Sequence, residues 1–133
     1  AETCSPDRPV PVCHFHGTDD EFAAYDGGPG KRSLSRTRFY SVQHSLGQWI
    51  KANGCRDTPK VTELPAEVDD GTKIVRYEYA AGKRGAEVVH YKIIGGGHTW
   101  PGQPTRIKFL GKTTGNLDAN EVMWAFFEEH ARD

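Results

Sequence analysis

The alternation of apolar and polar residues predicts a strand, a helix, a set of strands and a second helix, in that order along the chain. RPVPVCHFHG predicts a short buried strand over residues 10–15, ended by Gly17. After a loop rich in glycine, proline and charge over residues 19–38, apolar side chains fall on one helical stripe, and Gly54 lies just past its end: Phe39, Val42, Leu46, Trp49 and Ile50. Ser41 is suited to cap the start of this helix.

The second half of the chain predicts strands followed by a helix. KVTEL, residues 60–64, is typical of a short edge strand, and TKIVRYEY alternates, with Ile74 and Arg76 on one face. AEVVHYKII, residues 86–94, predicts a strand that runs directly into GGGHTWPG. Asp118 and Glu121 resemble a capping box for a last helix, whose apolar face is formed by Val122, Met123, Phe126 and Phe127.

This order of elements favours an α/β fold in which residues 1–133 form one part of a single domain. A parallel or mixed sheet needs cover on both faces, and two helices provide little of it. We therefore expect one end of an α/β sheet that is incomplete without further chain, and whose open edge could drive self-association.

Composition narrows the function classes. The 17 basic and 18 acidic side chains nearly balance, which argues against a nucleic-acid partner. No apolar run approaches the ~20 residues of a membrane span. Of the three cysteines, Cys13 lies in a strand pattern typical of the core. Cys4 and Cys55 are the better disulfide candidates, which makes an oxidising compartment plausible.

HFHGTDDEF, residues 14–22, allows a metal site or a catalytic acid. His14 and His16 project to the same face of a strand, as zinc ligands can. However, Thr18 and Asp19 stand where the metallo-β-lactamase pattern has an aspartate and a further histidine, and the other histidines show no paired ligand spacing. We expect no metal and no cofactor, and an interior hydrogen bond for His14.

The alternative is an acid and a base at neighbouring strand ends. Asp20 follows the first strand, and His98 follows the strand over residues 86–94, after three glycines. If these strands are parallel neighbours, the carboxylate can bond the imidazole Nδ1–H and orient it. GGGHTWPG lacks the lysine that ends a phosphate loop, so Trp100 is better explained as an apolar wall beside His98 or as cover for the core.

A catalytic triad also needs a nucleophile, and no residue of the chain has a convincing setting for one. The nucleophile elbow is Gly-x-Ser-x-Gly between a strand and a helix. Ser45 has Gly47 two residues later but Gln43 two residues before, and it lies inside the first predicted helix. Because α/β-hydrolases run serine, acid, histidine along the chain, the missing serine would precede residue 1.

Several motifs together resemble one esterase family: RPVPVCHFHGTDD, YDGG, WIKANGC, GAEVVHYKIIGGGHTWPG and LDANEVMWAFFEEH. They are similar to the carboxyl-terminal half of the polyhydroxybutyrate depolymerase-like α/β-hydrolases, which include feruloyl and acetylxylan esterases. The resemblance places the acid on Asp20, with Asp19 as the alternative, and the general base on His98. It implies two-step acyl transfer by a serine and a secreted or extracytoplasmic location.

The chain departs from this family in three places. The amino-terminal half is absent, a cysteine that family members often have before GAEV is missing, and Asp19 adds a second charge beside the presumed acid. We therefore expect a serine-type hydrolase of polyester or plant-wall esters that is inactive as this isolated chain and needs its missing half as a partner. The alternative is a stand-alone, non-catalytic half-domain that binds a polyester or glycan.

Candidate substrate-binding residues follow from both readings. Trp100 and Tyr25 are the aromatic side chains expected to contact an ester substrate, and in the non-catalytic alternative they would act with the basic loop at Lys31 and Arg32.

Overall fold

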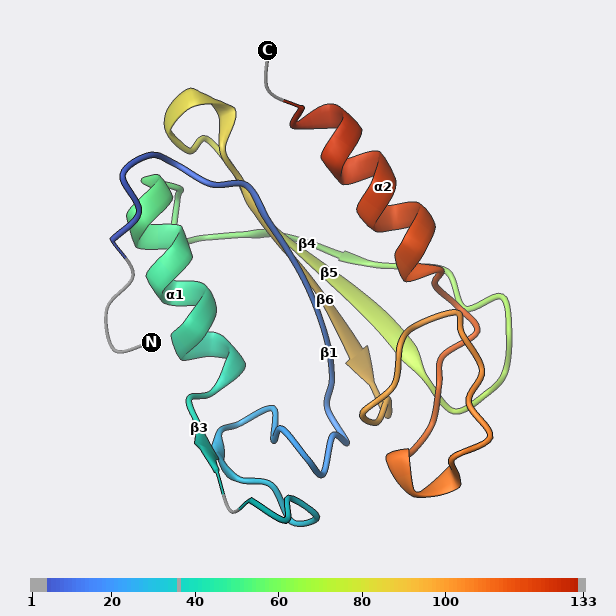
Figure 1. Cartoon of the computed structure of the whole chain (residues 1–133). Coiled ribbons are helices and arrows are strands. Elements are labelled where there is room, and N and C mark those ends of the chain that lie inside the picture. The colour runs from blue at the N-terminus through green and yellow to red at the C-terminus, as the bar shows by residue number, and fades with distance from the viewer. Residues whose placement is uncertain (1–4, 36, 132–133) are drawn as a thin grey trace.

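The computed structural model describes residues 5–35 and 37–131, which form a four-stranded sheet with helices α1 and α2 packed on opposite faces (Figure 1). Two short 3₁₀ helices, Lys83–Gly85 and Lys108–Leu110, lie in the connections. The strands and α-helices are β1 (Val12–Gly17), β2 (Gly28–Pro29), β3 (Arg38–Phe39), α1 (Val42–Asn53), β4 (Lys60–Glu63), β5 (Lys73–Tyr79), β6 (Val88–Ile94) and α2 (Ala119–Glu129).

The main sheet is mixed, with the strand order β1-β6-β5-β4. β1 and β6 pair in parallel, from Val12 beside Val88 to Gly17 beside Ile93, whereas β6–β5 and β5–β4 are antiparallel. The condition on which the acid–base hypothesis depends, that the first strand and the strand before GGGHTWPG are parallel neighbours, is therefore met. Because parallel strands end at the same edge, the segments after Gly17 and after Ile94 emerge side by side.

Alternation along β6 gives the sheet two cores. Val89, Tyr91 and Ile93 join Leu117 and Phe126 on the α2 side. On the other face, Val88 and Tyr79 pack against the apolar stripe of α1, formed by Val42, Leu46 and Ile50. Successive residues of a strand point to opposite faces, so this seven-residue strand is the centre of both layers.

The first helix begins later than its apolar stripe predicts. Ser41 is the N-cap, and its side chain accepts a hydrogen bond from the His44 backbone N–H, while Gly54 ends the helix in the left-handed conformation. Phe39 lies before this cap, in β3, and is 43% exposed. Its predicted place in the helix is wrong, because the cap at Ser41 makes Val42, three residues later, the first residue of the helix.

The second helix has the predicted N-cap but a narrower buried face. Asp118 accepts hydrogen bonds from the backbone N–H groups of Asn120 and Glu121. Phe126 is buried at 7% exposure, whereas Phe127 is 52% exposed. Adjacent residues lie about 100° apart around a helix, so both phenylalanines cannot face the sheet. The prediction that Phe127 contributes to the apolar face packed on the sheet is wrong.

The architecture is compatible with a partial α/β fold. β1 is at one end of the main sheet, where it pairs only with β6 among the described strands. The start of β1 is two residues later than predicted, because the backbone of Val10 is bonded instead to the side chain of Asn53.

In the described residues no helix is long and apolar enough to cross a membrane.

The cysteine predictions are only partly covered by the structure. Cys13 is partly buried and packs against the α2-side core, as expected, and burial raises its pKa to about 11. The Cys55 thiol donates a hydrogen bond to the Ala86 carbonyl at 3.4 Å. Cys4, the proposed partner of Cys55, lies outside the described residues.

Candidate functional site

The loops that follow β1 and β6 are bonded directly to each other. The Thr18 backbone N–H donates to the Ile93 carbonyl, and the Asp19 N–H donates to the Gly96 carbonyl, both at 2.9 Å. The Gly95 N–H donates in return to the Thr18 hydroxyl at 2.9 Å. These three bonds form a clasp that fixes the position of one loop relative to the other.

The glycines of both loops make this approach possible. A β-carbon on Gly17 would lie 2.2 Å from the Gly96 carbonyl oxygen, a distance that no side chain tolerates. The glycines before His98 thus do more than turn the chain. They also let the backbone of this loop approach the end of β1 closely.

The clasp brings together Asp20 and His98, the two residues that the sequence singles out. The His98 Nδ1 lies 2.9 Å from the Asp20 Oδ2. A carboxylate oxygen can only accept, so Nδ1 carries the proton and Nε2 of the neutral ring keeps a lone pair. The Asp20 side chain is 6% exposed and that of His98 is 51% exposed, so the carboxylate is shielded and the imidazole is open to its surroundings.

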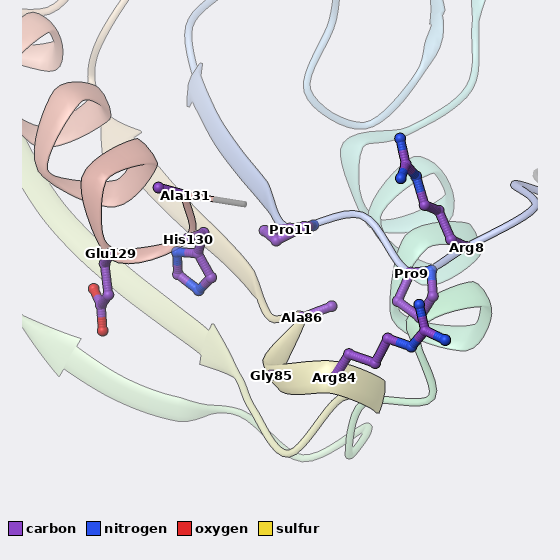
Figure 2. Close-up of a pocket in the computed structure, with 9 residues that line it drawn as sticks. All are labelled: Arg8, Pro9, Pro11, Arg84, Gly85, Ala86, Glu129, His130 and Ala131. Atoms are coloured by element: carbon purple, nitrogen blue, oxygen red, sulfur yellow. The ribbon is translucent and has the colours of Figure 1, made fainter. Parts of the chain in front are cut away.

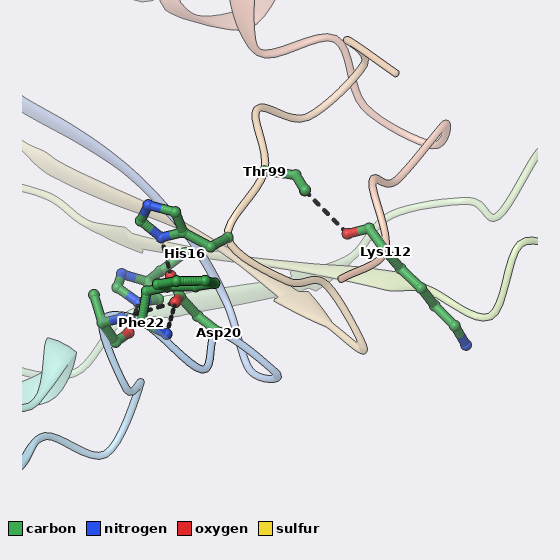
Figure 3. A network of polar contacts seen from close by, with 7 residues as sticks. His16, Asp20, Phe22, Thr99 and Lys112 are labelled. Atoms are coloured by element: carbon green, nitrogen blue, oxygen red, sulfur yellow. Dashed lines mark hydrogen bonds and ion pairs between the residues drawn. The ribbon is translucent and has the colours of Figure 1, made fainter. Parts of the chain in front are cut away.

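The loop backbone holds the carboxylate of Asp20 from the other side. Its Oδ1 accepts hydrogen bonds from the backbone N–H groups of Phe22, at 2.9 Å, and Ala23, at 2.8 Å (Figure 3). Asp19 is exposed, and its carboxylate accepts only from the neighbouring Thr18 hydroxyl, at 3.2 Å, among the contacts of the described residues. Of the two adjacent aspartates, Asp20 is therefore the one in contact with His98.

The two histidines of HFHG have different surroundings. The His16 Nε2 lies 2.7 Å from the Ala23 carbonyl oxygen and 3.5 Å from the Asp20 Oδ2. The His14 Nε2 is buried without a hydrogen-bond partner in the part of the chain that the structure describes. The prediction that His14 forms an interior hydrogen bond is therefore wrong. Burial, with a smaller contribution from His16, lowers the pKa of His14 to about 4, which keeps its ring neutral at pH 7.

His90 on β6 belongs to the same group of rings, and the sequence analysis does not single it out. Its Nδ1 lies 3.2 Å from the His14 carbonyl oxygen, so that nitrogen is the donor, and its Nε2 accepts from the Tyr25 hydroxyl at 2.8 Å. Burial lowers the pKa of His90 to about 3 and raises that of Tyr25 to about 12. His90 lies directly beside His14 in the parallel pairing of β1 with β6, so the register of these two strands is the signal that would have revealed it.

The two candidate substrate-binding residues differ in position. Trp100 is 44% exposed and lines a cavity of about 340 Å³ together with Phe15, His16, Asp20 and His98. Its indole N–H donates to the Asn120 side chain at 2.8 Å, which fixes the ring. Tyr25 does not line this cavity, because its hydroxyl bonds His90 and its ring packs beside the α1 core.

Further aromatic side chains surround His98. The Phe22 ring lies 5.3 Å from the His98 ring and 6.1 Å from that of Phe109, measured between centroids. Phe109 is 58% exposed. The open imidazole therefore has an apolar flank on which the organic groups of a substrate can pack.

None of the five serines lines the cavity beside His98. Ser41 caps α1 and Ser45 lies within it, Ser33 and Ser35 bond each other, and Ser5 precedes β1. The described residues thus contain an acid–base pair without a serine in contact with it.

A second cavity, of about 650 Å³, lies at the opposite end of β1 and β6 (Figure 2). It is lined by Arg8, Pro9, Pro11, Arg84, Gly85, Ala86, Glu129, His130 and Ala131. Ligand atoms of Glu87, Glu129 and His130 lie within 4.8 Å of one another. The His130 Nδ1 lies 2.8 Å from the Phe126 carbonyl oxygen and its Nε2 lies 3.2 Å from the Glu87 carboxylate, so both ring nitrogens already face oxygen atoms of the chain.

No protein-family profile matches the chain. It is 32% identical to Feruloyl esterase B of Piromyces equi over 96 residues, and this match covers 71% of this chain and 16% of that protein. It is 29% identical to "Putative esterase NocK" of Nocardia uniformis subsp. tsuyamanensis over 128 residues, and this match covers 88% of this chain and 37% of that protein. The chain therefore spans well under half the length of these curated relatives, and the similarities support an esterase-like family and ester hydrolysis at the general level.

Proposed function

We propose that this chain forms the acid–base half of a serine-type carboxylic-ester hydrolase, with Asp20 as the acid and His98 as the general base. The observation that carries the proposal is the 2.9 Å contact between the shielded Asp20 carboxylate and the His98 Nδ1. This contact leaves Nε2 with a free lone pair on a half-exposed ring, the form that a general base needs.

The reaction then follows two-step acyl transfer. A serine from a segment outside these 133 residues attacks the ester carbonyl while the His98 Nε2 accepts the hydroxyl proton. The imidazolium, stabilised by the Asp20 carboxylate, returns that proton to the leaving alcohol. In the second step His98 takes a proton from water, whose oxygen attacks the acyl-enzyme, and the imidazolium then gives this proton back to the serine oxygen as the carboxylic acid is released. As an isolated chain, residues 1–133 are expected to show no turnover by this route.

For the substrate we propose a polyester or a plant-wall ester, which the protein would meet outside the cytoplasm. The aromatic flank of His98, formed by Phe22, Phe109 and Trp100, supports an ester with extended apolar or flat groups. Tyr25 is a weaker candidate than Trp100 for contact with the substrate, because its hydroxyl is already hydrogen-bonded to His90.

The test uses a polypeptide that contains these residues together with the chain that precedes them, assayed on a short-chain aryl ester. His98→Ala should lower kcat by about 10³-fold or more, as for triad members generally. His44→Ala is the matched control, because His44 is an exposed histidine on α1 that stacks on Tyr40. Activity of the His98 variant within a few-fold of the parent would exclude the assigned base.

The second candidate is a non-catalytic half-domain that binds a polyester or glycan. It is favoured by the lack of a serine beside His98 among the described residues and by the exposure of Trp100. The sequence encoded upstream of Ala1 separates the two. A strand followed by Gly-x-Ser-x-Gly and a helix supports the enzyme, and the absence of such a segment supports the binding domain.

A further inference from the structure

We propose that His16 is a positioning residue for the same site, because its imidazole provides a second N–H group beside the Asp20 carboxylate. The inference rests on the proposed roles of Asp20 and His98. It assigns a task to the second histidine of HFHG, which is not a member of the proposed acid–base pair.

The protonation of His16 follows from its neighbours. Its Nε2 lies 2.7 Å from the Ala23 carbonyl oxygen and 3.5 Å from the Asp20 Oδ2, and both oxygens can only accept. Nε2 therefore carries a proton that is hydrogen-bonded to Ala23 and directed close to Asp20. The side chain is 17% exposed, so little water competes for this proton.

These contacts close a ring around the acid. The His16 N–H holds the carbonyl of Ala23, and the backbone N–H of Ala23 holds the Asp20 Oδ1 at 2.8 Å. The Asp20 Oδ2 then lies near two imidazoles, His98 at 2.9 Å and His16 at 3.5 Å. A carboxylate fixed at both oxygens cannot rotate away from His98, whose half-exposed ring has few other restraints.

The His16 ring is itself well held. It stacks on the His14 ring at 5.5 Å between centroids, and it makes a T-shaped contact with the Tyr25 ring, with 5.7 Å between centroids and an interplanar angle of 80°. The buried Gly17 follows it directly and brings β1 against the loop that carries His98. A fixed ring is what a positioning donor requires, because a donor that moves cannot define the orientation of its acceptor.

A simpler role for His16 is to staple the loop at Ala23 without affecting the base. NMR on the 133-residue chain distinguishes the two. His16→Gln keeps a side-chain N–H near the position of Nε2, whereas His16→Met removes it at similar size. We expect the His98 Nδ1–H proton to exchange with water about 10-fold faster in the Met variant, the equivalent of one ordinary hydrogen bond, and within about 3-fold of the parent in the Gln variant.

The backbone amide of Ala23 provides the control in the same spectra. If its exchange rises in the Met variant while that of the His98 Nδ1–H is unchanged, His16 is only a staple and the inference is overturned. The parent chain gives a test that needs no variant. Ring ¹⁵N shifts must show His16 protonated at Nε2, and a neutral ring protonated only at Nδ1 would overturn the inference even if the variants fail to fold.

Hydrolysis by the longer polypeptide separates this inference from the proposed function. His16→Met should lower kcat about 10-fold, and more than it changes KM, because the residue acts on the base through the Asp20 carboxylate. If His98→Ala leaves hydrolysis intact, the proposed function fails while the NMR result for His16 stands.

Discussion

Exchanging the Asp20 carboxylate for an amide should reverse the proton on His98. In Asp20→Asn the side-chain oxygen must remain at the Oδ1 position, because the backbone N–H groups of Phe22 and Ala23 lie 2.9 and 2.8 Å from it. The amide NH₂ then occupies the place of Oδ2 and donates toward the His98 Nδ1. The ring can accept that bond only with its proton on Nε2, where it can no longer act as a base.

The size of the effect follows from this change of tautomer. The variant keeps the volume of the residue and both backbone hydrogen bonds, so the free energy of unfolding should fall by only about 1 kcal/mol. The corresponding exchange in a serine protease triad lowers kcat by about 10⁴-fold, which corresponds to ~5.5 kcal/mol in the activation barrier. Activity should thus be lost far more than stability.

The assay pairs aryl-ester hydrolysis by the longer polypeptide with ¹⁵N spectra of the His98 ring in the 133-residue chain. Asp19→Asn is the matched control, because Asp19 is the exposed neighbour and does not contact His98. An Asp20→Asn variant with kcat within 10-fold of the parent, or with the proton still on Nδ1, would refute the reasoning. A large loss in the Asp19 variant alone would transfer the acid to that residue.

Three further predictions concern stability, each measured by urea denaturation of the 133-residue chain. Gly17→Ala should lower the free energy of unfolding by about 2 kcal/mol or more, because its methyl group would lie 2.2 Å from a backbone carbonyl oxygen. Gly47→Ala, with nothing within 4 Å, should not be destabilising. Asn53→Ala should cost about 3 kcal/mol, since this fully buried side chain both accepts from the Val10 N–H and donates to the Val10 carbonyl. Burial lowers the pKa of His90 from 6.5 to about 3, so the unfolded chain binds a proton that the folded chain does not. Stability should therefore fall as the pH drops below 6.5, by roughly 2 kcal/mol from this residue between pH 7 and 5, and the loss should shrink in His90→Gln.

Local patterns predicted the elements and the meeting of the two strand ends. Ser41 and Gly54 bound α1, and the strand over residues 86–94 ends in the glycines before His98. These features depend on a few neighbouring residues, which is why they can be read from the sequence. The parallel pairing of β1 with β6 was only the condition under which Asp20 and His98 could meet, and the structure contains it.

Features that depend on distant partners could not be predicted. The clasp between Thr18 and Gly95, the bond between Tyr25 and His90, and the contact of His16 with Ala23 each join side chains to groups whose positions only the fold defines. The exposure of Phe127 has the same origin, because an apolar stripe does not show how wide a surface the sheet offers to a helix.

The clasp between the two loops has a consequence for how such an enzyme can be divided. Every hydrogen bond that aligns Asp20 with His98 comes from within this one polypeptide, so the pair is assembled before any nucleophile arrives. A gene cut just upstream of these residues would yield two products, of which this one already holds the Asp20 carboxylate against the His98 ring. Mixing it with a separately made serine-bearing fragment should then restore catalysis at a rate limited by their association, which is the behaviour required of a split reporter.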